Sequence, residues 1–253
     1  MTAGNSRERG QSWVNEVLNT VQDYGCILRL AHPTDTATYA TPEVIATVKH
    51  RLRFIEVYTG ISVRKWNNNG VMENKSSTVA GVMLDDPFDM FLTQGNFLFG
   101  MAVSDERPTL GRTGSNMFVE NHSKNIKNGC VKVFSDTLTS EEIFKSLISG
   151  NFYASSDADV SVNSITVENG KYIVDVGKAD VIVEFLKENN TIVSTVTTNT
   201  ANTTASYDIT GDEMFVRARL YELNNLSYNA DYWYYNKEWI VWTQPLFISK
   251  TIL

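Results

Sequence analysis

The residue pattern of this chain changes near residue 155, and this change limits the folds open to it. Before that point, apolar residues at helical spacing alternate with short apolar runs, which is typical of alternating strands and helices. After it, helical spacing gives way to short alternating runs separated by Asn-Gly, Asn-Asn and Gly-Asp turns. The pattern predicts an α/β domain over residues 1–154 and an all-β domain over residues 155–253.

The first domain contains apolar runs that predict strands, and the first of them ends in a His-Pro step at His32. In folds built from alternating strands and helices, ligands bind where parallel strands end, so His32 is the first candidate for chemistry. A capping box beginning at Thr139 predicts a helix that stops at Gly150. The predicted strands cover 26–32, 54–58, 98–103 and 130–134, and a further short helix covers about 86–92.

The second domain is predicted to be a small antiparallel β-sandwich of roughly seven or eight strands, because its runs alternate and turn residues separate them. The predicted strands cover 160–162, 165–167, 172–176, 181–185, 191–196, 206–209 and 214–220.

Charge and hydropathy exclude some classes of partner. The chain has 22 basic and 29 acidic residues and a formal charge of −7, which disfavours binding to nucleic acid or to an anionic membrane. No signal peptide or transmembrane segment is expected, which favours a soluble cytoplasmic or virion protein. Cys26 and Cys130 lie in apolar runs, so we predict that both are core residues without a disulfide.

Five segments in order, residues 31–33, 54–60, 88–95, 100–105 and 150–155, resemble the C-terminal half of a PHP domain (polymerase and histidinol phosphatase superfamily). The chain is most similar to the CehA/McbA-like variety, in which a β-sandwich follows a Gly-x-Phe-Tyr-Ala-Ser step. Residues 242–247 resemble the usual closing strand of that sandwich. The resemblance implies a distorted seven-stranded α/β barrel with divalent metals at the carboxyl ends of its strands and hydrolysis of phosphate esters. The family's usual His-x-His and Asp-His motifs are not found in the sequence, so a partial, half barrel is expected.

By position in this resemblance, His32 matches the His-Pro ligand and Asp105 matches the aspartate of an Asp-x-His motif, whose last position is Arg107. An arginine stays cationic and has no lone pair to offer a metal. Two ligands also fall short of the three or four of a catalytic zinc site, so structural roles for His32 and Asp105 are favoured over metal binding. No cofactor is expected from this chain alone, and a divalent Zn, Mn or Fe ion only if a partner completes the site.

Two other groups of residues have both a functional and a structural interpretation. Arg107, Arg112 and Ser115 can form an anion-binding cradle, although solvated loop side chains explain them more simply. The aromatic stretch 228–242 can present a platform for a carbohydrate or a protein partner, or pack as a hairpin onto the sandwich, which we favour. The platform residues are Trp233, Tyr235 and Trp239.

These features favour a degenerate, non-catalytic PHP-like protein that acts as a binding or structural subunit of a larger assembly such as a virion. The alternative is a metal-dependent phosphoesterase subunit whose remaining ligands come from another chain. Half a barrel leaves strand edges unpaired, so a partner is expected to cover the open edge. That partner is either another copy or a separate chain.

Overall fold

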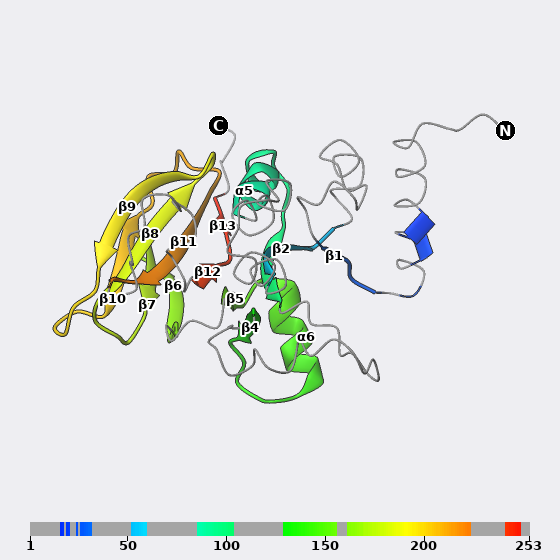
Figure 1. Cartoon of the computed structure of the whole chain (residues 1–253), viewed down its shortest axis with the longest axis horizontal. Coiled ribbons are helices and arrows are strands. Elements are labelled where there is room, and N and C mark those ends of the chain that lie inside the picture. The colour runs from blue at the N-terminus through cyan, green and yellow to red at the C-terminus, as the bar shows by residue number, and fades with distance from the viewer. Residues whose placement is uncertain are drawn as a thin grey trace, which may run out of the picture.

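The computed structural model of the chain is mostly β-sheet, with two helices, α5 and α6, described along their whole length (Figure 1). Within the described residues, neither helix has the length and apolar character needed to cross a bilayer. The described residues are 16–17, 19–20, 24, 26–31, 52–59, 85–103, 129–155, 161–223 and 241–248.

A three-stranded parallel sheet is formed by the first half of the chain in the order β1-β2-β3. Helix α5 lies between β2 and β3 in the sequence and buries Phe88, Phe91 and Leu92 in a core shared with β2. The predicted strands at 54–58 and 98–103 and the helix at 86–92 are therefore confirmed, while the first strand is shorter than predicted. The bounds are β1 Arg29–Leu30, β2 Phe54–Thr59, α5 Asp85–Thr93 and β3 Phe99–Val103.

A larger antiparallel sheet has the order β4-β5-β12-β11-β8-β9, and β13 pairs with β11 beside this path. The expected domain boundary at residue 154 falls within β5, whose neighbours are β4 and β12. The bounds are β4 Cys130–Val133, β5 Phe152–Ser155, β8 Val181–Lys187, β9 Thr191–Thr197, β11 Phe215–Glu222, β12 Val241–Thr243 and β13 Leu246–Phe247.

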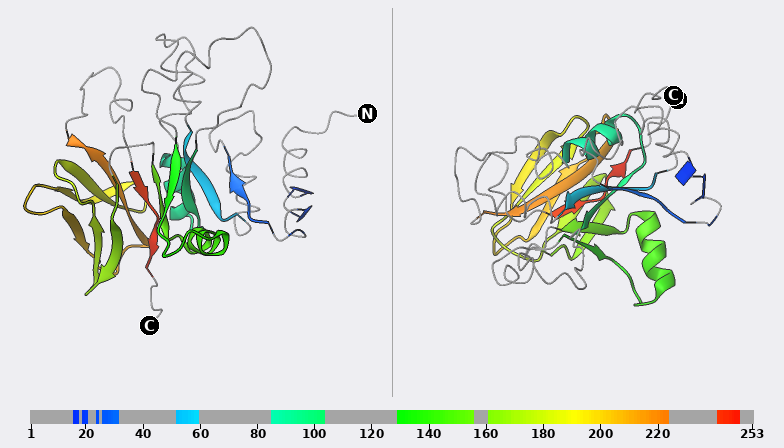
Figure 2. Two further views of the ribbon diagram at one scale, coloured as in Figure 1. Left: turned by 90° about the horizontal axis from the view of Figure 1, so that it is seen from below. Right: turned by 45° about the vertical axis from the view of Figure 1, so that its right-hand side comes forward.

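The third sheet, β10-β7-β6, is called the small sheet below. It packs on one face of the large sheet, and the parallel sheet and α5 pack on the other face (Figure 2). The second half of the chain thus contains the predicted antiparallel sheets, and its strands match the predicted runs from 165 onward. The predicted strand at 160–162 is wrong in its described part, since residues 161–163 form no strand. The bounds are β6 Ser164–Glu168, β7 Lys171–Asp175 and β10 Thr204–Asp208.

Helix α6 (Ser140–Ser149) begins and ends at the predicted residues. The Thr139 side chain accepts a hydrogen bond from the backbone N–H of Glu142, and Gly150 takes the left-handed conformation at the other end. Arg53 donates two hydrogen bonds to the carbonyl oxygen of Ile148. This cation at the carboxyl end of the helix compensates the partial negative charge there and ties α6 to the start of β2.

The cysteine prediction is partly wrong. Cys26 is exposed and Cys130 is only half-buried, and both are free thiols. Cys26 lies in a non-strand segment before the short β1, and Cys130 opens β4, which ends the large sheet, so neither position is enclosed on all sides. The half barrel itself stays a prediction.

Candidate functional site

The carboxyl ends of the three parallel strands lie at one edge of their sheet, because both neighbouring pairs run parallel. Strand β1 ends at Leu30, two residues before His32, and β3 ends at Val103, two residues before Asp105. Strand β2 lies between them, so β1 and β3 are about 10 Å apart across the sheet at ordinary strand spacing. The end of β1 at Leu30 is level with Gly100, three residues before the end of β3. The fold therefore brings to one edge the two strands that precede the predicted metal ligands.

The predicted site residues themselves, His32 and Asp105 included, lie outside the described residues. The same holds for the anion-binding set and for the aromatic platform, so each of these assignments stays a prediction. Within the described ranges, no three His, Cys, Asp or Glu side chains form a group that could hold a metal ion. The residues concerned are His32, Asp105, Arg107, Arg112, Ser115, Trp233, Tyr235 and Trp239.

A buried carboxylate lies in the middle strand of this sheet. Glu56 of β2 forms an ion pair with Arg29 of β1, with 3.0 Å between Oε1 and Nη2. The carboxylate is almost fully enclosed while the guanidinium is partly exposed, so the cation reaches in from the surface to neutralise a charge held inside. The pair fastens the short β1 to β2.

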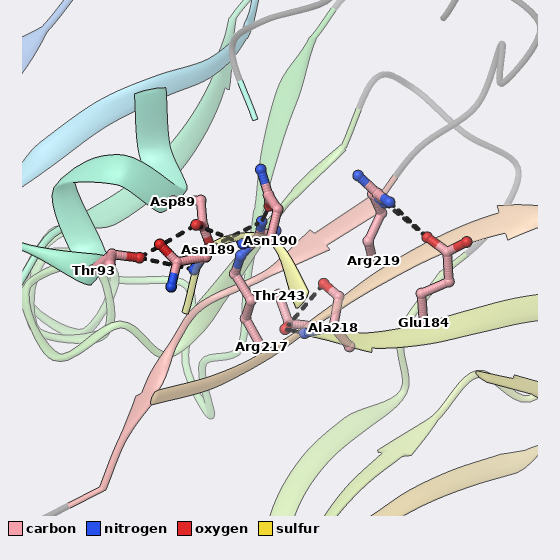
Figure 3. Close-up of polar contacts among 9 residues, drawn as sticks. All are labelled: Asp89, Thr93, Glu184, Asn189, Asn190, Arg217, Ala218, Arg219 and Thr243. Carbon is pink, nitrogen blue, oxygen red and sulfur yellow. Dashed lines mark hydrogen bonds and ion pairs between the residues drawn. The ribbon is translucent and has the colours of Figure 1, made fainter. Parts of the chain in front are cut away.

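A second polar cluster joins α5 to the turn between β8 and β9 (Figure 3). The Asn190 N–H donates to Asp89 Oδ2 at 2.7 Å, and the Asn189 N–H donates to Thr93 Oγ1 at 3.0 Å. Both asparagines have a positive φ, which asparagine tolerates better than most residues and which a tight hairpin turn requires. Helix α5 thus holds the turn through its side chains.

Arg217 of β11 occupies the centre of this cluster (Figure 3). It is fully buried, donates to Asn190 Oδ1 at 2.5 Å, and lies 3.8 Å from Asp89 Oδ1. Its guanidinium also lies over the Phe88 ring, 5.5 Å from the centroid. A buried cation is stable only with such compensation, so this cluster connects α5 to the large sheet and presents no reactive group to solvent.

Beside this cluster, Glu184 of β8 holds two side chains of β11. Arg219 donates to Glu184 Oε2 from Nη2 at 2.7 Å and from Nε at 3.0 Å, and Tyr221 donates to Oε1 at 2.6 Å. Burial, together with the Glu184 carboxylate, raises the pKa of Tyr221 above its ordinary value. Tyr221 is therefore a neutral hydrogen-bond donor at physiological pH, not a proton acceptor.

The closing segment at residues 243–244 links the sheets. The Gln244 amide forms two hydrogen bonds with the backbone of Gly100 in β3, accepting from its N–H at 2.7 Å and donating to its carbonyl at 2.8 Å. The Thr243 hydroxyl accepts from the Ala218 N–H at 2.7 Å and from the Tyr172 hydroxyl at 2.9 Å. Two adjacent side chains thus connect the parallel sheet, the large sheet and the small sheet.

Sequence reasoning missed the buried charges on β11. Arg217 and Arg219 alternate with Val216, Ala218 and Leu220, so the pattern assigns them to the face away from the sandwich core. Alternation predicts a solvent-facing side here, and nothing local in the sequence signals that α5 covers it. The one available signal is the pair of arginines itself, since two cations on one strand need anionic neighbours if they are enclosed.

Comparison of the chain with protein families, with curated proteins and with solved structures finds no match.

Proposed function

We propose that this chain is a non-catalytic binding or structural subunit of a larger assembly, descended from a PHP-like ancestor. The observation that carries the proposal is how the described part of the chain uses its buried carboxylates. Each one binds a cation, a hydroxyl or a backbone N–H of a neighbouring segment, as connecting groups in a rigid protein do. These carboxylates belong to Glu56, Asp89, Glu184 and Glu213.

Glu213 illustrates the pattern. Its carboxylate accepts hydrogen bonds from the hydroxyls of Tyr207 and Thr210 and from the N–H of Gly211. Burial alone would raise the pKa of this carboxyl group, but the hydrogen bonds outweigh burial and lower it to about 2. A group held as a fixed anion in this way organises its loop, whereas a general acid or base needs a pKa nearer neutrality.

The sequence adds a chemical argument. In the PHP resemblance, Arg107 stands where the family has a histidine ligand, and an arginine cannot coordinate a metal. The donor set of this chain, His32 and Asp105 together with a nearby cation, therefore does not fit a complete metal centre. The purified full-length chain should show no metal-dependent hydrolysis of phosphate mono- or diesters above a no-protein control. Turnover that depends on added Zn²⁺, Mn²⁺ or Fe²⁺ and is lost in His32→Ala would overturn the proposal.

A second candidate function is a phosphoesterase subunit whose site is completed by another chain. What supports it is the common edge at which β1 and β3 end, since this places the strands that precede His32 and Asp105 two strand positions apart. Coexpression with a partner that carries a His-x-His motif should then yield a complex containing stoichiometric metal. Failure of every such partner to copurify, or a complex whose metal content is unchanged by His32→Ala, would count against this candidate.

A further inference from the structure

Among the described residues, β6 is the outer strand of the small sheet, and the backbone groups on its side away from β7 can be assigned. The β6–β7 hairpin turns through Asn169 and Gly170, both with positive φ, and pairs Glu168 with Lys171. In a hairpin with a two-residue turn, the closing pair exchanges hydrogen bonds, and the exchange repeats at every second residue. The backbone groups of Ser164, Thr166 and Glu168 thus point to β7, and those of Ile165 and Val167 point outward.

Within the part of the chain that the structure describes, the side chains at this edge leave apolar surface uncovered. Ile165 and Val167 lie opposite Val174 and Tyr172 of β7, which are buried in the sandwich core, so all four face inward. Val167 is nevertheless 50% exposed, because no described strand lies beside β6 on the side away from β7. An inward-facing valine at an open edge is surface that an additional strand would bury.

The other described edges of the two antiparallel sheets differ from β6. Strands β9 and β10 lie against each other where the two sheets meet, and β4 carries Lys132. Strand β6 carries neither lysine nor proline, its pairing with β7 has no register shift, and its one charge is Glu168 beside the turn. Lysine, proline and β-bulges are features by which proteins protect edge strands from pairing, and β6 has none of them.

We propose that β6 pairs antiparallel with β6 of a second copy of this chain, about a two-fold axis at Thr166. In this register Ile165 lies opposite Val167 of the second copy, so the outward backbone groups of both residues form inter-chain hydrogen bonds. The inner face gains two apolar cross-strand pairs, and the outer face places Thr166 opposite its own copy and Glu168 opposite Ser164. No like charges oppose each other, and the two small sheets join into one continuous sheet.

Cysteine cross-linking of the full chain tests this register. In a Cys26→Ser background, Thr166→Cys should form a disulfide-linked dimer on mild oxidation, because residues opposite each other in a non-hydrogen-bonded pair have Cα atoms about 4.5 Å apart. Ser164→Cys is the matched control on the same strand and face. It should run as a monomer in nonreducing electrophoresis, because the residue opposite it in the second copy is Glu168 and not a cysteine. Equal cross-linking by both variants, or none by Thr166→Cys, would overturn the pairing.

Sedimentation velocity gives an independent readout. Val167→Lys should weaken self-association about tenfold or more in dissociation constant, since each dimer contains two such positions and a lysine protects an edge strand. Ile192→Lys on β9 is the matched control, because Ile192 is 47% exposed on another strand, and it should associate like the wild type. Circular dichroism confirms that both variants fold. Association of Val167→Lys equal to the wild type contradicts the inference.

The inference rests on the proposed role as a subunit of an assembly, but the two fail separately. If the wild-type chain self-associates but the Thr166→Cys variant forms no cross-link, the β6 interface is overturned and the proposed function stands. Metal-dependent phosphoesterase turnover that is lost in His32→Ala overturns the proposed function, and it does so whether or not the cross-link forms.

Discussion

The two faces of the large sheet are packed differently: one face carries the apolar core of the sandwich, and the other adds buried ion pairs to a second apolar core. On β11, Val216, Ala218 and Leu220 face the small sheet and lie in an apolar core with residues of β7, β8 and β10. The alternate residues Arg217 and Arg219 face the other way and bind carboxylates. One strand thus carries an apolar face and a face on which the buried Phe215 lies beside these two paired arginines, which we call the ionic face.

This difference has a physical consequence. Apolar burial is strong but non-directional, so the sandwich core accepts changes in shape that keep its volume. Hydrogen-bonded charges require defined distances and angles and are costly when one partner is lost, so the ionic face admits few arrangements of α5. The sandwich face therefore tolerates changes of side-chain shape, and the ion pairs of the other face, together with its apolar core, determine where α5 lies on the sheet.

Replacement of Arg217 by Ala should cause the largest loss of stability, about 3–5 kcal/mol, because it leaves the buried Asp89 without its cation. Urea denaturation followed by circular dichroism measures the change. Lys171→Ala, which breaks a solvent-exposed ion pair with Asp208, is the control and should cost about 0–1 kcal/mol. The double variant Arg217→Met with Asp89→Leu should lose less than Arg217→Ala alone. Equal losses for Arg217→Ala and Lys171→Ala would remove the distinction between the two faces.

On the sandwich face, Leu220→Ala should destabilise the chain by about 2–5 kcal/mol, because the side chain is fully buried and a cavity remains. Leu220→Met keeps the volume and should cost less than about 1.5 kcal/mol. Arg217→Met is the counterpart on the ionic face, and its cost should be much closer to that of Arg217→Ala. If methionine is tolerated equally well at both positions, the two faces do not differ in the proposed way.

Gln244→Leu removes both hydrogen bonds to the Gly100 backbone and leaves a buried N–H and a buried carbonyl there. Unsatisfied groups of this kind cost about 1–3 kcal/mol each, and the apolar replacement offsets part of the loss, so a net cost of about 2 kcal/mol is expected. Gln94→Leu, at an exposed position, serves as the control. Hydrogen exchange should also show faster opening of the Gly100 amide in Gln244→Leu, and an unchanged rate would contradict this role.

Lowering the pH tests how much the ionised Glu213 carboxylate stabilises the fold. Its pKa is lowered from 4.5 to about 2 in the folded chain, so its stabilising contribution is complete above about pH 4.5 and is lost as the pH falls toward 2. The Glu213→Gln variant should be less stable than the wild type at pH 6, by about 1–2 kcal/mol, and the difference should shrink between pH 4.5 and pH 2.5. Glu168→Gln at an exposed position is the control. A difference that is constant with pH would contradict the assignment.

Local signals in the sequence predicted the elements well. The limits of α6 follow from Thr139 and Gly150, which act within one turn of the helix, and both take the predicted roles. Turn residues likewise separate β6 from β7 as expected. The strands at the carboxyl edge of the parallel sheet were also predictable, although the ligand candidates that follow them, His32 and Asp105, are outside the described residues.

Contacts between distant segments could not be predicted in the same way. Asn190 binds Asp89 across 101 residues, and Gln244 binds Gly100 across 144. A period-two pattern tells which residues share a face of a strand but not which element covers that face. The enclosed charges of Arg217 and Glu184 therefore look like surface residues in the sequence, and only the packing of α5 and its neighbours shows otherwise.

Native mass spectrometry of the purified full-length chain tests the central claim most directly, because it reads assembly and bound metal together. A subunit of an assembly without a metal centre should appear as a dimer or higher multiple of the 28.4 kDa chain, or bound to a partner, with no stoichiometric divalent metal. A monomer that carries one or more tightly bound divalent ions per chain, lost in His32→Ala, would contradict it.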